Sequence, residues 1–98
     1  MRKTNTQPMK EVIQLYLKAL KIDDKIKEAK IIGNWNKSMG VVIAKATTDL
    51  YIRNRVLYVH VNSPAIRNDL NLMRSEVVKH LNRQVGENVI TDLILKGI

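Results

Sequence analysis

Two tyrosines flank two arginines over a short stretch in the middle of the chain, at Tyr51, Arg53, Arg55 and Tyr58. Aromatic rings stack on the bases of single-stranded nucleic acids and guanidinium groups bind the phosphates, so this combination is typical of a nucleic-acid contact face. A structural role is the alternative, because two tyrosines that face each other across a pair of strands stabilise that pair. The pattern leaves both interpretations open.

Two further arginines, Arg67 and Arg74, are seven positions apart. On a helix this spacing is about two turns, so both side chains share one face and could contact successive phosphates or an acidic partner. Exposed helices also carry arginines at this spacing without any binding role. We include both residues in the predicted nucleic-acid site.

The residue types give little support to catalysis. The chain has no cysteine, which excludes disulfides, thiolate nucleophiles and cysteine-ligated zinc. His60 and His80 have no partners at metal-binding spacing. His60 opposite Asp49 lacks a nucleophile and an oxyanion donor, so we expect only a surface pair. We therefore expect a non-enzymatic protein with no catalytic residue, no metal, no cofactor and no small-molecule substrate.

The charge balance points to polyanionic partners. Among 98 residues, 17 are Lys or Arg and nine are Asp or Glu, a formal net charge of +8. Such an excess favours single-stranded or duplex nucleic acid or an anionic membrane, although many small domains are basic for solubility alone. No run approaches the ~18 apolar residues of a membrane span, and no apolar signal segment follows the polar residues 1–7. We expect one cytoplasmic domain over residues 1–98, without a membrane partner and with a flexible basic arm at 1–6.

Apolar residues at helical spacing indicate two helices in the N-terminal half. The first spans about 8–21, with an apolar face formed by Met9, Val12, Ile13, Tyr16 and Leu20. Asp23 is a suitable N-cap for a second helix from about 24. Its apolar positions, which place Trp35 in the core, are Ile32, Trp35, Met39, Val42 and Ala46. This spacing favours a helix that persists past Gly40 to about residue 45. Gly40 itself marks either close packing against another backbone or a break in the helix.

The following residues alternate with a period of two, which predicts strands over 47–53 and 56–62 with a turn at Asn54 and Arg55. A two-residue turn gives the core-facing pairs Ile52–Leu57, Leu50–Val59 and Thr48–Val61. It gives the outward pairs Arg53–Val56, Tyr51–Tyr58 and Asp49–His60. Arginine accepts a positive φ less well than asparagine, so a longer loop is the alternative.

A capped helix and a last strand complete the pattern. Ser63 and Pro64 begin a long helix that Gly86 ends near Val85. Its apolar stripe is Ile66, Leu70, Met73, Val77 and Leu81. Residues 89–96 predict a third strand with Thr91, Leu93 and Leu95 facing inward. The order α-α-β-β-α-β predicts an α+β fold with one three-stranded sheet packed on helices.

In their order and spacing, these motifs resemble the DciA-like family, long catalogued as a domain of unknown function. The likeness rests on Trp35 with Gly40, on the hairpin over 50–61, and on the run from Asn62 through Leu81 and Asn82 to Gly86. It covers about Met9 to Lys96. The resemblance implies a KH-like fold, affinity for nucleic acid and a role in helping the bacterial replicative helicase onto DNA.

This sequence departs from the family pattern at two positions. Arg55 stands where the family usually has glycine in the hairpin turn, and Ile66 stands where an aromatic residue often begins the third helix. The chain also lacks Gly-x-x-Gly, the loop with which typical KH domains clamp a nucleic-acid backbone. Nucleic-acid binding would therefore have to use another surface.

Two functional hypotheses follow. The first is a nucleic-acid-binding accessory module that assists loading of the replicative helicase, where the helicase role rests on the resemblance alone. The alternative is a protein-interaction adaptor whose basic surface recognises an acidic partner and binds nucleic acid only weakly. An exposed sheet edge would also allow self-association by strand addition.

Overall fold

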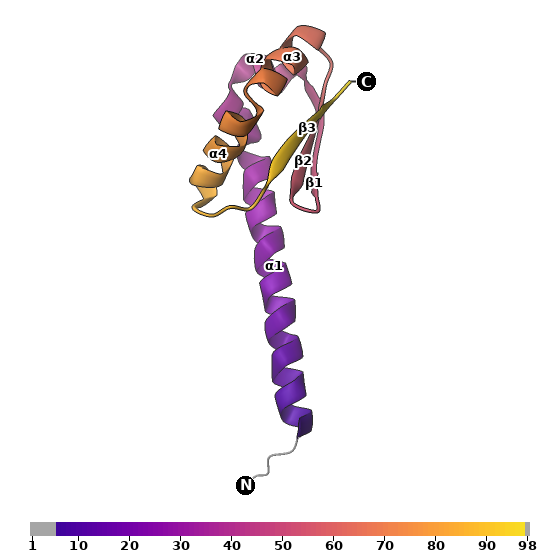
Figure 1. Ribbon diagram of the computed structural model, residues 1–98, viewed down its shortest axis with the longest axis vertical. Coiled ribbons are helices and arrows are strands. Elements are labelled where there is room, and N and C mark those ends of the chain that lie inside the picture. The colour runs from indigo at the N-terminus through magenta and orange to yellow at the C-terminus, as the bar shows by residue number, and fades with distance from the viewer. Residues whose placement is uncertain (1–5, 98) are drawn as a thin grey trace.

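A computed structural model describes residues 6–97, and its helices and strands follow the expected order (Figure 1). The elements are α1 (Thr6–Met39), α2 (Val41–Ala46), β1 (Thr47–Arg53), β2 (Val56–Val61), α3 (Pro64–Leu72), α4 (Arg74–Val85) and β3 (Asp92–Lys96). The fold is α+β, with an open three-stranded sheet in the order β1-β2-β3 and helices on one of its faces. The arm predicted at residues 1–6 lies outside the described residues, except for Thr6, which begins α1.

The sheet is mixed, because β1 and β2 pair antiparallel whereas β2 and β3 pair parallel. The turn between β1 and β2 has two residues, as predicted, and both Asn54 (φ 52°) and Arg55 (φ 64°) take the positive φ that such turns require. The predicted hairpin pairs are confirmed from Asp49–His60 to Arg53–Val56.

One predicted hairpin pair is wrong. Val61 pairs with Thr47 instead of Thr48, with an irregularity between Thr47 and Asp49. The indole N–H of Trp35 donates to Thr47 Oγ1 (3.0 Å), and that hydroxyl donates to the carbonyl of Ile43 (2.8 Å). Because these bonds fix Thr47 against the end of α2, the extra residue is accommodated as a bulge at Thr48.

The hydrophobic core lies between the helices and the covered face of the sheet. Its most deeply buried side chains are Ile31, Trp35, Leu57, Val59, Val61, Leu81, Ile90 and Leu93. Trp35 is 0% exposed, which confirms its predicted core position. The two sequence periods, 3.6 on the helices and two on the strands, identify most of this core correctly, but they place Ile32 rather than Ile31 on the buried side of the helix and do not predict the burial of Ile90.

A single helix, α1, replaces the two predicted N-terminal helices. Asp23 caps no helix, and its carboxylate instead pairs with Lys27 one turn later (2.7 Å). No proline or glycine lies between residues 9 and 32, so nothing in the chain ends the helix at Asp23. The first half of α1 projects from the body (Figure 1), and the predicted apolar face from Met9 to Leu20 is exposed rather than packed.

The helix breaks at Gly40 rather than continuing to residue 45. Gly40 has φ 89° and ψ 173°, a conformation that is essentially restricted to glycine. No heavy atom lies within 4 Å of the point that a Cβ would occupy, so conformation rather than close packing requires the glycine. The change in direction leaves Val42 72% exposed, contrary to its predicted place on the apolar face, and buries Ala46.

Alanine at two glycines should therefore have opposite effects. Gly40→Ala is expected to lower the free energy of unfolding by about 1–3 kcal/mol, because alanine would be strained at this φ. Gly33→Ala, in the exposed middle of α1, should raise it by about 0.5–1 kcal/mol. Urea denaturation followed by circular dichroism measures both changes. Equal effects at the two positions would show that alanine is not strained at position 40.

The third predicted helix is divided at Met73 into α3 and α4. Met73 leaves the helical conformation (φ −106°, ψ 19°), and its N–H is shared between the carbonyls of Asp69 and Leu70. The bend turns Met73 out to solvent, contrary to its predicted place in the apolar stripe, while Leu70 and Val77 reach the same core. Ser63 is the predicted N-cap of α3.

The last strand begins at Asp92 rather than at residue 89, because Asn82 holds the segment before it. Asn82 Oδ1 accepts from the amides of Val89 and Ile90 (3.0 Å each), and its Nδ2 donates to the carbonyl of Ile90 (2.8 Å). Ile90 is buried and Thr91 is exposed, so the inward position predicted for Thr91 is wrong. The inward prediction is confirmed for Leu93.

Candidate nucleic-acid interface

The face of the sheet away from the helices brings together side chains from all three strands. Two rows cross it: the first is Tyr51, Tyr58 and Ile94, and the second is Asp49, His60 and Lys96. On β2, Tyr58 and His60 alternate with the buried Leu57 and Val59, so they and their cross-strand partners lie on the opposite face. Since no helix covers this side, the rows are open to solvent (Figure 1).

The two tyrosines stack on each other, and each has a cation close to its ring. The ring centroids of Tyr51 and Tyr58 are 5.0 Å apart with an interplanar angle of 13°. Arg53 Cζ lies 5.7 Å from the Tyr51 centroid, and Lys96 Nζ lies 5.4 Å from the Tyr58 centroid. We call these four residues the tyrosine cluster. It unites both interpretations of the sequence, because the tyrosines form a cross-strand pair and also lie beside exposed cations.

The tyrosine cluster offers two kinds of contact to a ligand. Its rings can stack on planar apolar groups, and its two cations can bind anions. A cation–ring contact at an exposed site contributes only about 0.5–1 kcal/mol, so either cation can leave its ring at small cost. A planar ligand group can therefore replace a cation on a ring while the cation moves to a neighbouring negative charge.

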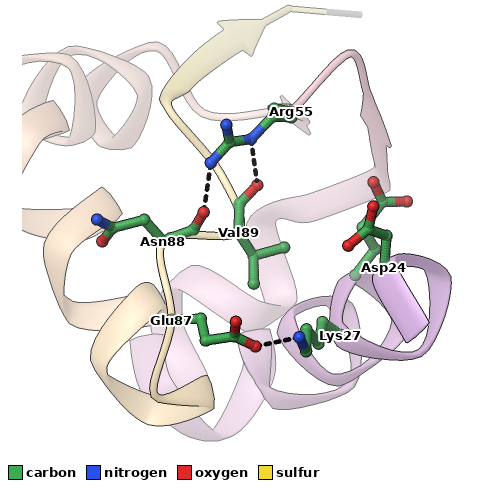
Figure 2. A pocket seen from close by; sticks show the side chains of 7 residues that line it. Asp24, Lys27, Arg55, Glu87, Asn88 and Val89 are labelled. Atoms are coloured by element: carbon green, nitrogen blue, oxygen red, sulfur yellow. Dashed lines mark hydrogen bonds and ion pairs between the residues drawn. The ribbon is translucent and has the colours of Figure 1, made fainter. Parts of the chain in front are cut away.

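Arg55 does not join the tyrosine cluster, although it is close to Arg53 in sequence. Figure 2 shows its guanidinium bonded to two backbone carbonyls of the loop before β3. Nε donates to the carbonyl of Val89 (3.2 Å) and Nη2 donates to that of Asn88. The backbone carbonyl of Arg55 accepts from the amide of Thr91 (2.7 Å). Arg55 therefore ties the hairpin turn to this loop.

Arg67 and Arg74, predicted to share a helix face, lie on different helices and have separate partners. Arg67 Nη1 donates to the carbonyl of Val61 (2.6 Å), and its guanidinium lies against Gly97. Arg74 Nε pairs with Asp92 Oδ1 (3.2 Å) in a half-exposed ion pair. Asp92 lies at the end of the open sheet face, beside Val56, so Arg74 neutralises one of its acidic groups.

A second cluster of charges lines a pocket of about 310 Å³ between α1 and the loop after α4 (Figure 2). Lys27 bridges Asp23 and Glu87 there, and hydrogen bonds to these two carboxylates hold the pKa of Lys27 above its ordinary value. The other charged residues of the pocket are Asp24, Glu28 and Arg55. Because both cations are bonded to groups of the protein, this pocket joins α1 to the loop rather than offering an anion site.

His60 and Asp49 are paired across β1 and β2, as predicted. The Asp49 carboxylate accepts from the amide of Leu50 (2.9 Å), and the His60 ring lies 6.0 Å from that of Tyr51. Over residues 6–97, no three His, Asp or Glu side chains gather as ligands for a metal ion. No helix in this part of the chain is long and apolar enough to cross a membrane.

Lys96 belongs to this face but was not predicted. Its place beside His60 depends on the parallel register of β3 on β2. The sequence does carry the signal that Ile94 and Lys96 alternate with the inward Leu93 and Leu95. The sequence does not indicate which strand β3 pairs with, because a long helical connection separates β2 from β3.

The fold and this site define a small α+β domain with one open sheet face that carries aromatic and basic side chains. The family described as Dna[CI] antecedent, DciA matches residues 8–95. The chain therefore belongs to the DciA family, as its sequence motifs indicate.

Curated relatives with the name UPF0232 occur in several actinobacteria. A protein of Corynebacterium glutamicum (strain R) is 28% identical over 67 residues, which are 68% of this chain and 38% of the relative. One of Mycobacterium leprae (strain Br4923) is 26% identical over 91 residues, 93% of this chain and 48% of the relative. The Mycolicibacterium smegmatis protein, named for the recF-gyrB intergenic region, is 29% identical over 73 residues, 74% of this chain and 38% of the relative. The chain thus matches less than half the length of these relatives.

Proposed function

We propose that this chain is a non-enzymatic accessory protein of bacterial DNA replication that binds nucleic acid and assists loading of the replicative helicase. Membership of the DciA family supports the replication and helicase roles. The formal charge of +8 supports a polyanionic partner, and the proposed setting is the cytoplasm. The single observation that carries the nucleic-acid half is the tyrosine cluster on the open face of the sheet.

The proposed binding surface is this open sheet face, which serves in place of the Gly-x-x-Gly loop of a typical KH-like domain. Bases of a single strand stack on Tyr51 or Tyr58, and each base displaces the cation that lies over the ring. Arg53 and Lys96 then bind the phosphates on either side. Such binding is sequence-tolerant, because every base has an aromatic face and phosphates carry no sequence information.

In this proposal the other three predicted arginines, Arg55, Arg67 and Arg74, do not contact the nucleic acid directly. Arg55 and Arg67 hold the hairpin turn and the end of β2 through backbone carbonyls. Arg74 removes the negative charge of Asp92 from one end of the face, so it promotes binding without contacting the strand itself. Loss of Arg55 would disturb the hairpin, so a variant that combines it with Arg53 would confuse binding with folding.

Removing both cations of the tyrosine cluster should weaken binding and flatten its salt dependence. For Arg53→Ala with Lys96→Ala, the slope of log K against log salt for single-stranded DNA should fall by about 1.4, or ~0.7 for each lost phosphate contact. The matched control is Lys37→Ala with Lys79→Ala, two exposed lysines outside this face, which changes net charge equally. Fluorescence anisotropy at several salt concentrations measures the slope. Equal slopes in the two double variants would rule out the sheet face.

The same titration tests stacking separately. Tyr58→Ala should cost about 1–3 kcal/mol of single-strand affinity, whereas Tyr58→Phe should cost little because stacking needs the ring and not the hydroxyl. Loss of the tyrosine pair also weakens the hairpin by about 0.2–1 kcal/mol, so circular dichroism must show that both variants are folded. Equal affinity of the alanine and phenylalanine variants would mean that the rings are structural only.

The adaptor alternative has one observation in its favour. An apolar pocket of about 440 Å³ lies between α2 and α3, and Val41, Val42 and Met73 on its rim are more than half exposed. Exposed apolar surface of this kind is typical of protein contacts. Pull-down from a source lysate with and without nuclease separates the two functions, because an adaptor retains its partners when nucleic acid is destroyed, whereas partners held through bound nucleic acid are lost.

A further inference from the structure

The N-terminal half of α1 has no partner within residues 6–97. Every side chain from residue 9 to residue 26 is exposed, and this part of the helix projects from the body (Figure 1). Nine of these side chains are large and apolar: Met9, Val12, Ile13, Leu15, Tyr16, Leu17, Leu20, Ile22 and Ile26. A soluble monomer seldom exposes a continuous apolar surface of this size, which commonly marks an interaction site.

One line of residues along this helix has the spacing of a coiled-coil seam. Steps of three and four residues join Val12, Leu15, Ala19, Ile22, Ile26, Ala29 and Gly33. All seven are exposed, and no polar residue interrupts the series. In heptad notation Val12, Ala19, Ile26 and Gly33 occupy a positions, and the other three occupy d positions. We call this line the heptad seam; it extends over three heptads.

The heptad seam is directed away from the body of the protein. Ile31 and Trp35, through which α1 contributes to the core, lie roughly 170° around the helix axis from the centre of the seam. A second helix can therefore lie along the whole seam without meeting the sheet or α4. Two copies paired in this way would hold their globular parts on opposite sides of the helix pair.

We propose that the heptad seam binds the same seam of a second copy of this chain, in a parallel coiled coil. A parallel pair places Lys18 at g opposite Asp23 at e of the second copy, and this ion pair occurs twice by symmetry. Lys25 opposite Lys30 is the one repulsive contact. The antiparallel arrangement that aligns the full seam instead opposes Lys18 to Lys25 and brings no acidic residue to either lysine, so the charges favour the parallel pair.

The apolar surface of the seam and its flanks approaches the size that such a dimer needs. Val12, Leu15, Ile22 and Ile26, with Tyr16 beside them, are between 49% and 65% exposed. Together they offer on the order of 500 Å², and the aliphatic stems of the flanking lysines raise this toward the ~800 Å² per partner of a stable interface. Ala19, Ala29 and Gly33 would add little to insertion into a membrane, but they let two helices approach closely. The small residues thus favour a second helix as the occupant.

The proposal does not depend on nucleic-acid binding, but it has a consequence for it. A dimer carries two tyrosine clusters in one particle. If a single strand can reach both clusters, the second contact becomes intramolecular and the overall affinity rises without any new type of contact.

Disulfide cross-linking tests both the pairing and its direction, because the natural chain has no cysteine. In a parallel pair each Ala19 faces Ala19 of the second copy, so Ala19→Cys should form a dimer on mild oxidation. Leu17→Cys, also at an exposed position but on the opposite side of α1, is the matched control and should remain monomeric. Non-reducing electrophoresis measures the dimer. Equal cross-linking of the two variants would overturn the assignment of the seam.

Sedimentation equilibrium tests the free energy of pairing without a cross-link. The natural chain should show a concentration-dependent dimer, and Ile22→Glu with Ile26→Glu should raise the dimer Kd by at least about 100-fold, since unpaired carboxylates would enter the seam. Ile13→Glu with Leu17→Glu, exposed outside the seam, should leave Kd nearly unchanged. All these positions are outside the core, so the variants should remain folded by circular dichroism. A natural chain that stays monomeric at every concentration would overturn the proposal. Binding of that monomer to anionic phosphatidylglycerol vesicles through Ile22 and Ile26 would then identify a membrane surface as the occupant.

Discussion

Replacement of Trp35 by alanine is expected to lower the free energy of unfolding by about 3–5 kcal/mol, because a large buried ring leaves a cavity that its neighbours fill only in part. The side chain is 0% exposed and lies at the centre of the core. The variant also loses the donor to Thr47 Oγ1, the bond that fixes the start of β1 against α2. Since domains of this kind are stable by about 5–15 kcal/mol, Trp35→Ala should be close to unfolding.

Urea denaturation followed by far-ultraviolet circular dichroism measures this loss, which fluorescence cannot follow because Trp35 is the only tryptophan of the chain. Trp35→Phe is the control, since it keeps an aromatic ring in the core and removes the N–H donor. It should cost clearly less than the alanine variant. A loss below about 1 kcal/mol for Trp35→Ala would contradict the central position of the ring.

Asn82→Leu is expected to cost about 3–5 kcal/mol, although leucine is apolar and similar in size. Asn82 is 7% exposed, and its side chain bonds both the amide and the carbonyl of Ile90, while it shares the amide of Val89 with the carbonyl of Glu87. Each backbone group left without a partner in a buried place costs about 1–3 kcal/mol. Thermal unfolding and hydrogen exchange at these two amides measure the effect. Unchanged protection of both amides would show that Asn82 is not needed to hold this segment.

Asn82→Asp separates the contributions of the acceptor and the donor. The new carboxyl group can still accept from both amides, but only its protonated form can donate to the carbonyl of Ile90. Hydrogen exchange should therefore show the amide of Ile90 protected in Asn82→Asp and unprotected in Asn82→Leu. Loss of this protection in both variants would show that the donor to the Ile90 carbonyl is the essential part of the side chain.

The hydrogen-bond and ion-pair partners of the arginines decide whether replacing a basic residue reports on binding or on the protein's own structure. Arg55 and Arg67 donate to backbone carbonyls, and Arg74 neutralises Asp92, so removal of any of the three alters the protein itself. Arg53 and Lys96 are themselves exposed and lie over half-buried rings, with contacts that are weak and easily exchanged. Variants of Arg53 and Lys96 consequently give the direct test of the proposed nucleic-acid contact.

The sequence by itself determined the hairpin and the centre of the core. A period of two on either side of Asn54 and Arg55 places Leu57 and Val59 on the buried face, and a two-residue turn then places Tyr51 beside Tyr58. The helical spacing around Trp35 identified its buried side in the same way. Such features are local, because a repeated step along the chain defines a face wherever the element finally lies.

Only the tertiary structure decided which cations remain available to a ligand. Arg55 finds its carbonyls 33 and 34 residues further along the chain, and no local pattern encodes a partner at that distance. Lys96 reaches Tyr58 through the parallel pairing of β3 on β2, which depends on how α3 and α4 cross between the two strands. The tertiary structure also decides the exposure of α1. The spacing of its apolar residues predicts a buried face. The body ends before that face begins, so the apolar side chains from Met9 to Ile26 are left exposed.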